Sequence, residues 1–355
     1  PNLKWEKTKS FNTGLTFILL DKRISVEAEY YYKRTKDAFM TKEVASMNGV
    51  DSYAINGGDI ENKGFGVDVT LNPIRTKDWH WTLSTSFSKD YNKVKNDPDA
   101  QTYDYLDFLN GTVVVKDKAV NTFYSYKFIG LSPLSGGPVF DDYEERQHEL
   151  DGLSKYETFK KVLTASGRRE PYMSGNLTTN LSYKNIRLSG TFAYSLGAKV
   201  RLFQMYRSEL IAPESNLRRE LLDRWQNPGD EKHTNIPAVI GRYEPYYFTY
   251  NEHWSQTSYY NVQPFASSLW NMYDYSDLRV VSGNYLKCNN LMVTYEFGER
   301  ILSQLRMTRL ALSLSGTNLF TISSKKLKGQ TPTQGFTEVS LSDRPTYSFS
   351  LSVSF

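Results

Sequence analysis

The chain has little cysteine, no long apolar run and little net charge, and each scarcity excludes a class of protein. One cysteine, Cys288, among 355 residues cannot form a disulfide framework or a multi-cysteine metal site. No segment approaches the ~18 consecutive apolar residues that a membrane-spanning helix requires. A net charge of +4, with basic and acidic residues interspersed, provides no basic face for nucleic acid.

Residue patterns for catalysis and metal binding are also missing. No G-x-S-x-G motif or phosphate-binding loop occurs, and the lone G-x-G at 64–66 lies in a predicted strand, where glycine makes room for a neighbour or a kink. The acidic run at 141–145 lacks the spacing of an EF-hand, which favours a solvated loop over a calcium site. The histidines, none with metalloprotease spacing, are His80, His148, His233 and His253. We therefore expect no enzyme, no metal and no cofactor.

Aromatic residues are abundant, with 26 Tyr, 19 Phe and 6 Trp, and many recur at every second position. The clearest case is the C-terminal segment YSFSLSVSF, Tyr347 to Phe355, where apolar side chains alternate with serines. A period of two indicates a strand with one apolar and one polar face. The same alternation predicts nine long strands, at 9–20, 24–38, 60–72, 79–95, 172–184, 186–203, 284–297, 307–322 and 343–355.

The connections between these strands alternate in length. Those at 21–23, 73–78, 184–185 and 298–306 are short, and those at 39–59, 96–171, 204–283 and 323–342 are long. A soluble β-rich carbohydrate-binding module would not readily give this pattern with such long strands. A transmembrane barrel has short periplasmic turns, long outer loops and aromatic girdles. Aromatic residues stand at the strand ends as Tyr30, Tyr32, Trp79, Trp81, Tyr183, Tyr295 and Phe297. The sequence thus predicts an all-β, transmembrane antiparallel barrel with long extracellular loops.

The number of strands carries a further expectation. If the short turns are periplasmic, the first of the nine strands begins outside and the last ends in the periplasm. A single-chain bacterial barrel has an even number of strands, and an unpaired edge in hydrocarbon is not tolerated. We therefore expect the chain to be part of a larger barrel, or to pair with another chain.

Several segments resemble the C-terminal half of SusC/RagA-type TonB-dependent outer-membrane transporters. They include GGDIENKGFGVDVTLNP, WTLSTSFSKDYNKV, DRWQNPGDEKHTNIP, SGNYLKCNNLMVTYEF and SGTNLFTIS, in that order along the chain. The resemblance implies a 22-stranded barrel of which residues 1–355 would be the C-terminal portion with about the last nine strands. The signal peptide, plug domain and N-terminal barrel strands would be absent. The segment 131–171, with LSGGPVFDDYEERQHEL, departs from the glycine- and aspartate-rich stretch of many relatives.

The resemblance also implies a function and partners. It implies TonB-dependent active import of an oligomeric nutrient, a glycan or a peptide, across the outer membrane of a Gram-negative, Bacteroidetes-like cell. A SusD-like surface lipoprotein would cover the outer loops, and the TonB complex would act through the absent plug. The barrel wall would contact outer-membrane lipid as a multi-pass protein, and no nucleic acid is expected. The alternative is a passive outer-membrane diffusion porin.

The connection 204–283 is the predicted substrate-binding region, because it concentrates aromatic rings beside amides and carboxylates. Such rings suit the apolar faces of sugars or a peptide backbone, whereas the alternative is that they pack the loop. The candidate substrate-binding residues are Tyr243, Tyr247, Tyr250, Trp254, Tyr260 and Trp270. Earlier in the connection, Leu217, Leu221 and Trp225 follow Ser215 at helical spacing and predict a short capped helix.

Two single residues carry further expectations. Cys288 lies beside the apolar face of a predicted strand, where a packed thiol is the ordinary role. Phe355, by the resemblance, is the C-terminal assembly signal through which outer-membrane barrels are recognised for insertion.

Overall fold

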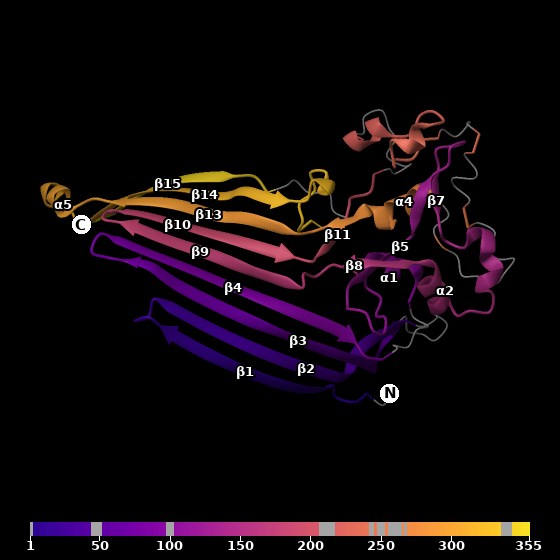
Figure 1. Ribbon diagram of the computed structural model, residues 1–355, viewed down its shortest axis with the longest axis horizontal. Coiled ribbons are helices and arrows are strands. Elements are labelled where there is room, and N and C mark those ends of the chain that lie inside the picture. Colours follow the sequence, from indigo (N-terminus) through magenta and orange to yellow (C-terminus); the bar gives the residue numbers. More distant parts are fainter. Residues whose placement is uncertain are drawn as a thin grey trace.

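Nine long strands form one antiparallel sheet and follow one another across it in sequence order (Figure 1). They are β1 (Lys7–Leu19), β2 (Ile24–Glu43), β3 (Ser52–Arg75), β4 (Trp79–Val94), β9 (Met173–Tyr183), β10 (Ile186–Leu196), β13 (Tyr285–Glu296), β14 (Arg309–Ser323) and β15 (Thr346–Ser354). This computed structural model describes residues 3–43, 52–96, 103–205, 217–240, 245–246, 253–254, 265, 268–334 and 343–355. The prediction of nine long antiparallel strands is confirmed.

The strand register places the alternating apolar side chains of the nine strands on one face. Residues directly opposite each other across two strands point to the same side of the sheet. One row runs from Phe349 through Leu314, Val293 and Leu188 to Leu181. Another runs from Leu19 through Ile24 and Leu71 to Leu83. Side chains on this face are widely exposed, as for Leu314 at 60% and Phe349 at 68%, and an apolar patch of this extent marks an interaction surface.

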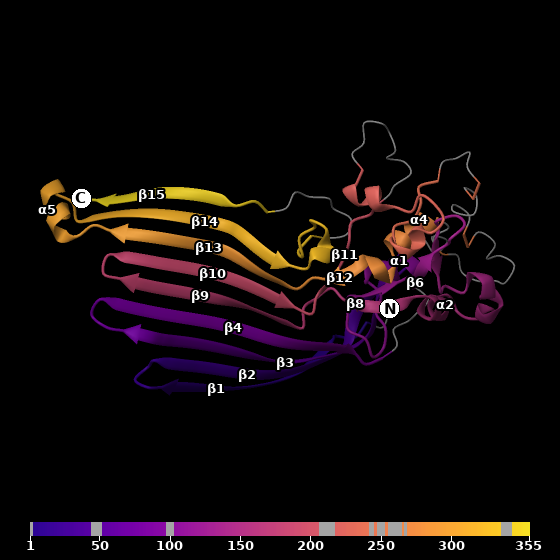
Figure 2. The same ribbon diagram turned by 45° about the horizontal axis from the view of Figure 1, so that its top comes forward.

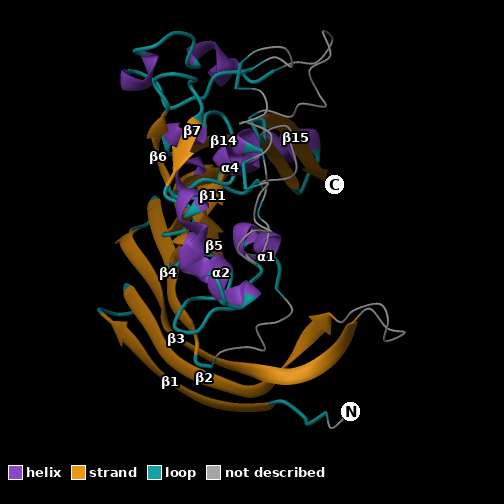
Figure 3. Ribbon diagram, turned by 90° about the vertical axis from the view of Figure 1, so that its right-hand side faces the viewer, coloured by secondary structure: helices purple, strands orange, loops and turns teal. Residues whose placement is uncertain are grey.

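The apolar face is the convex side of the curved sheet. Helices α1 (Tyr105–Asn110) and α2 (Lys155–Val162) lie within the curve (Figure 3). The connection that carries them meets the polar face, where the side-chain oxygen of Asn92 accepts a hydrogen bond from the Val120 amide at 2.9 Å. Asn92 stands on the same face of β4 as Ser84 and Ser86. The polar side chains therefore line the inside of the curve.

The short connections meet at one end of the sheet and the folded long connections at the other (Figure 1, Figure 2). The N-terminus lies at the long-connection end and the C-terminus at the short-turn end, as the strand count requires. Aromatic rings mark the short-turn end: Trp79 packs on Tyr183 with centroids 4.3 Å apart, and Tyr295 on Phe297 at 4.9 Å. The aromatic residues thus occupy the position of an interfacial girdle.

The connection predicted at 39–59 is mostly strand. The strands β2 and β3 continue to pair beyond an irregularity after Thr35, as far as Glu43 opposite Ser52. The sequence pattern did not predict this continuation of β2 and β3, because polar residues such as Lys42 and Asn56 weaken the alternation of apolar side chains there.

Two further boundaries differ from the predictions. The strand predicted at 186–203 ends at Leu196, because Gly197 adopts a φ of 86° that diverts the chain. It continues as β11 (Lys199–Arg201), which pairs with β12 (Val280–Ser282) in a separate sheet. The short connection 298–306 contains a helix, α5 (Glu299–Leu305), which lies at the short-turn end.

The long connections fold into what we call the outer loop domain, namely the described residues within 103–172, 199–205, 217–282 and 324–334. Besides α1, α2, β11 and β12, its elements are β5 (Thr122–Ser125), β6 (Phe128–Leu131), β7 (Pro138–Phe140), β8 (Thr164–Arg168) and α4 (Leu269–Asp274). Its 3-10 helices are Glu144–Leu150, Arg219–Asp223, Asp230–Lys232, Asp277–Arg279 and Lys325–Leu327. No helix among the described residues is long and apolar enough to cross a membrane.

Candidate functional site

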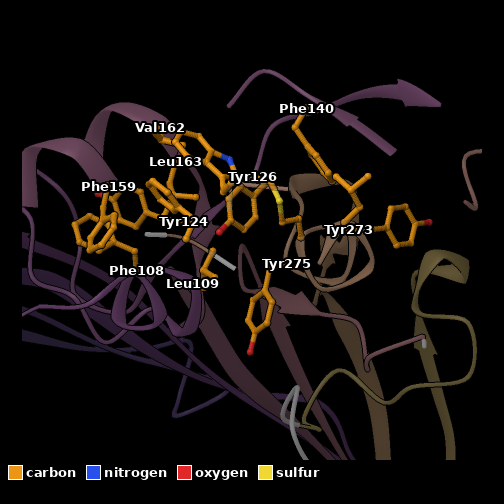
Figure 4. Close-up of a cluster of buried hydrophobic side chains, with 14 of the residues drawn as sticks. Phe108, Leu109, Tyr124, Tyr126, Phe140, Phe159, Val162, Leu163, Tyr273 and Tyr275 are labelled. Atoms are coloured by element: carbon orange, nitrogen blue, oxygen red, sulfur yellow. The ribbon is translucent and has the colours of Figure 1, made fainter. Parts of the chain in front are cut away.

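The outer loop domain has an aromatic core built from two connections that are distant in sequence (Figure 4). Phe159 of α2 packs edge-on against Phe108 of α1, with ring centroids 5.8 Å apart. Its ring also meets Phe265 at 5.0 Å, and Phe265 meets Trp254 at 4.9 Å. Such pairs add about 0.5–1.5 kcal/mol each beyond their buried area. The two connections therefore form one packed body at the outer end of the sheet.

Arg201 is a fully buried cation at the junction between the sheet and this body. It lies on β11 and is 1% exposed. Its guanidinium donates to the carbonyl oxygens of Leu109 at 3.0 Å and Tyr124 at 2.9 Å, and to the Ser125 hydroxyl at 3.1 Å. One side chain thus joins α1, β5 and β11.

Aromatic rings and a carboxylate surround the Arg201 charge. The rings of Phe123 and Tyr275 each lie 5.3 Å from the guanidinium carbon. Burial lowers the pKa of Arg201 to about 9, because desolvation disfavours its charged form, while Tyr275 and Asp274 act in the opposite direction. The side chain therefore remains positively charged at neutral pH.

A second buried ionic cluster lies beside Arg201. Arg279 is within 3.7 Å of the Asp274 carboxylate and 3.3 Å of the Glu220 carboxylate. Asp274 also accepts a hydrogen bond from the Met205 amide at 2.9 Å. Breaking a buried pair on one side costs about 3–5 kcal/mol, so the cluster fixes segments 203–205, 217–223 and 274–279 relative to each other.

The connection between β14 and β15 is tied to the same place by Gln330. Its side-chain amide donates to the Arg201 carbonyl at 3.0 Å and accepts from the Phe203 amide at 2.8 Å. Beside it, Leu327 packs with Val200 and Val281 in a small buried cluster. The three long connections that form the outer loop domain, between β4 and β9, β10 and β13, and β14 and β15, therefore converge on β11.

A cavity of about 1250 Å³ lies between segment 220–236 and the rim formed by β11, β12 and the 3-10 helix at Lys325–Leu327. It exceeds the ~300–1,000 Å³ typical of small-molecule sites, so it has room for part of an oligomer. Its basic residues are Lys199, Arg224, His233, Arg279, Lys326 and Lys328, and its acidic residues are Glu220, Asp223, Asp230 and Asp277. The walls offer charge and hydrogen bonds more than stacked rings.

The acidic run at 141–145 is engaged by basic and polar side chains. Asp142 is 4% exposed and contacts the His253 ring at 2.9 Å and the Trp254 indole nitrogen at 3.0 Å. Asp141 pairs with Lys127 at 3.2 Å and Arg146 at 3.1 Å. In the part of the chain that is described, no group of three or more His, Cys, Asp or Glu side chains is placed to hold a metal ion.

The structure describes two of the six predicted substrate-binding residues. Trp254 is 2% exposed in the aromatic core, and Trp270 is 5% exposed and donates to the Ala238 carbonyl at 3.0 Å. Both rings pack the loop, which is the alternative that the sequence left open. The residues Tyr243, Tyr247, Tyr250 and Tyr260 lie outside the described residues.

The helix predicted from Leu217, Leu221 and Trp225 is absent. A 3-10 helix at Arg219–Asp223 takes its place, and Leu217 is 50% exposed although Leu221 and Trp225 are buried. The tighter turn follows from tertiary contacts, since the Trp225 amide donates to the Ile236 carbonyl instead of continuing a helix. The predicted cap, Ser215, is outside the described residues.

Two small residues in the sheet have the ordinary roles expected of them. A Cβ on Gly64 would lie 2.5 Å from the Lys89 carbonyl and 2.8 Å from the Tyr31 ring, so this glycine makes room for its neighbours. Cys288 is a buried free thiol at an irregularity of β13, opposite Phe192 and Phe320. No signal in the sequence pointed to Arg201 or Gln330, because both stand in segments without a motif.

Residues 1–200, more than half of the chain, match a family model described as TonB dependent receptor-like, beta-barrel. Curated relatives include "TonB-dependent receptor P3" of Formosa agariphila, 25% identical over 337 residues, covering 90% of this chain and 30% of that protein. "TonB-dependent receptor SusC" of Bacteroides thetaiotaomicron is 25% identical over 308 residues, covering 83% of this chain and 26% of that protein. The chain spans about a third or less of the length of these relatives.

Among solved structures, the chain is similar to "Structure of the RagAB peptide transporter", with a TM-score of 0.72 and 19% identity. The match covers all of this chain and 36% of the solved one. At this level of identity the likeness concerns the fold, a partial barrel of long antiparallel strands. Together with the family model, it shows that this chain belongs to the TonB-dependent receptor-like β-barrel family of the outer membrane.

Proposed function

We propose that this chain forms the C-terminal part of a transporter that imports an oligomeric nutrient across the outer membrane in a TonB-dependent step. Residues 1–355 supply barrel wall and outer loops. A SusD-like surface lipoprotein closes over the outer loop domain, and the TonB complex acts through a plug region outside this chain. The nutrient is a glycan or a peptide.

The observation that supports this proposal most directly is the pairing of an apolar convex face with a folded outer loop domain at one end. The apolar rows suit a barrel wall against lipid, while polar side chains line the concave side. The names of similar proteins, a TonB-dependent receptor called SusC and a peptide transporter called RagAB, support import of an oligomer. The charged cavity beside β11 suits a substrate with polar or charged groups.

A deletion strain tests the proposed function. We expect cells lacking the gene to lose uptake of one class within a panel of fluorescent oligosaccharides and peptides, and the intact gene to restore it. Uptake should stop when the proton-motive force is dissipated, because TonB draws on it. Restored uptake that continues without the proton-motive force would instead support the passive porin.

We further propose that Phe355 is the assembly signal at the end of β15. The residue is 86% exposed on the edge of the sheet, and the neighbouring backbone is held by the Thr308 amide, which donates to the Ser354 carbonyl at 2.8 Å. We expect Phe355→Ala to reduce the amount of folded protein in outer-membrane fractions several-fold, with Phe349→Ala as the matched loss of a phenyl ring from the same face of the same strand. Equal yields for the two variants would show that Phe355 contributes only apolar contact.

A further inference from the structure

Basic side chains gather on the convex face at the outer end of β1 to β4. The register places on this face Lys7, Lys9, Arg34, Lys36, Lys63, Lys89 and Lys93. The acidic residues on the same face are Asp59, which pairs with Arg34 at 2.7 Å, and Glu61, which pairs with Lys95 at 3.3 Å. Lys95 is an eighth base on this face, and Lys93 pairs with Asp117 at 2.8 Å. Eight bases against three acids leave an excess of positive charge on a face that is otherwise apolar.

Two successive cross-strand pairs in this cluster consist of like charges. Lys7 stands directly opposite Lys36, and Lys9 directly opposite Arg34. Like charges in such positions destabilise a strand pair by a few tenths of a kcal/mol or more. Asp59 engages Arg34 through two hydrogen bonds, at 3.0 and 2.7 Å, and so offsets the second pair. The like-charge pair that an external anion would stabilise is therefore Lys7 with Lys36.

The cluster stands at the height of a membrane interface. At the short-turn end of the sheet, β1 ends at Leu19, β2 starts at Ile24 and β4 starts at Trp79. Lys9, Arg34 and Lys89 each lie ten residues from that end of their own strand. Ten residues extend about 33 Å, or about 25 Å vertically at a tilt of roughly 40°, which is the height of the apolar band of an outer-membrane barrel.

Tyrosine rings accompany the cations, as expected at an interface. Tyr32 stands opposite Lys63 in the register. The ammonium group of Lys89 lies 5.2 Å from the ring of Tyr91 and 5.6 Å from that of Tyr172. The cations thus border the apolar band and do not extend into it.

The cluster is confined to one side of the sheet. At the corresponding height of β13 and β14, the convex face carries Leu286, Phe320 and Ile322, which are 38%, 47% and 62% exposed. A general preference for cations at the interface would place them on these strands as well. The restriction to β1–β4 indicates a local binding site.

We propose that the convex face of β1–β4 binds the phosphate groups of an outer-leaflet lipid, with Lys7, Lys9, Lys36 and Lys63 as the principal contacts. Phosphorylated glycolipids form the outer leaflet of Gram-negative cells, and their phosphates lie level with these cations. Lysine and arginine donate charge-assisted hydrogen bonds to phosphate oxygens. The bound phosphates relieve the repulsion between Lys7 and Lys36, and the adjacent tyrosines contact the apolar part of the lipid.

The test uses the full-length protein that carries this chain, purified in neutral detergent. Native mass spectrometry measures the binding of phosphorylated lipopolysaccharide, of the same lipid after enzymatic dephosphorylation, and of inorganic phosphate. We expect the phosphorylated lipid to bind, the dephosphorylated lipid to bind at least tenfold more weakly, and inorganic phosphate not to compete. The substitutions Lys7→Gln, Lys9→Gln, Lys36→Gln and Lys63→Gln together should lower the affinity by about fivefold for each cation, at roughly 1 kcal/mol per charge.

The matched control removes four bases at the opposite end of the same strands, with Lys22→Gln, Arg23→Gln, Arg75→Gln and Lys77→Gln. We expect this variant to bind the phosphorylated lipid like the parent protein. In lipid-free detergent, the variant with Lys7→Gln, Lys9→Gln, Lys36→Gln and Lys63→Gln should have a Tm no lower than that of the parent, because repulsion between the cations is removed. Added lipid should no longer raise the Tm of this variant. Equal loss of binding in both variants, or unchanged binding in the first, would overturn the proposal. The result is independent of which nutrient is imported.

Discussion

Replacing Arg201 with methionine is expected to loosen the outer loop domain while the nine-stranded sheet stays folded. Methionine fills a similar volume between Phe123 and Tyr275 but cannot donate to the carbonyls of Leu109 and Tyr124. Buried carbonyls without a partner cost about 1–3 kcal/mol each. The helix α1 and strand β5 should therefore separate from β11.

Hydrogen exchange measures this effect segment by segment. A loss of about 3–5 kcal/mol in the loop domain corresponds to protection lower by roughly two to four orders of magnitude, if exchange there reports local opening. Amides of β9, β10 and β14 should keep their protection, because their partners lie within the sheet.

Two controls separate the geometry of Arg201 from its charge. Lys199→Gln removes a positive charge two residues away on β11, without contact to the Leu109 or Tyr124 carbonyl, and should leave exchange unchanged. Arg201→Lys keeps the charge but lacks the planar fork of donors, so it should resemble Arg201→Met more than the parent. Normal protection in Arg201→Lys would show that a buried charge alone holds the domain together.

The sheet could be predicted from the sequence because its signal is local. Alternation in segments such as 347–355 and 65–71 follows from a strand with two different environments on its faces. Where one face loses that contrast, as in the ribbon around Lys42 and Asn56, the strand ends were predicted wrongly. Once neighbouring strands pair in the observed register, the alternation alone places the apolar rows on one face of the sheet.

The outer loop domain could not be predicted in the same way, because its contacts are distant in sequence. Arg201 meets Leu109 across 92 residues, and Gln330 meets Phe203 across 127. The aromatic residues of the connection 204–283 were noticed for their number, but Trp254 and Trp270 turn inward to fill a core that only tertiary structure defines. Composition indicated an important region and did not distinguish binding rings from packing rings.

The second large effect concerns the convex face itself. We expect Leu314→Arg to destabilise the protein in a bilayer by about 2–4 kcal/mol, the cost of a guanidinium near the midplane on the lipid side of a barrel. Leu314 stands between Val293 and Phe349 in an apolar row and is 60% exposed in this chain. The matched control, Ser315→Arg, places the same side chain one position further along β14, on the concave polar face opposite Ser348.

The central claim is that the convex apolar face contacts lipid and the concave polar face does not. The most direct test is equilibrium unfolding, by denaturant, of the full-length protein and of the Leu314→Arg and Ser315→Arg variants in phosphatidylcholine bilayers. We expect Leu314→Arg to lose about 2–4 kcal/mol of unfolding free energy, whereas Ser315→Arg should stay within roughly 1 kcal/mol of the parent. Equal losses for the two variants, or a larger loss for Ser315→Arg, would contradict this claim.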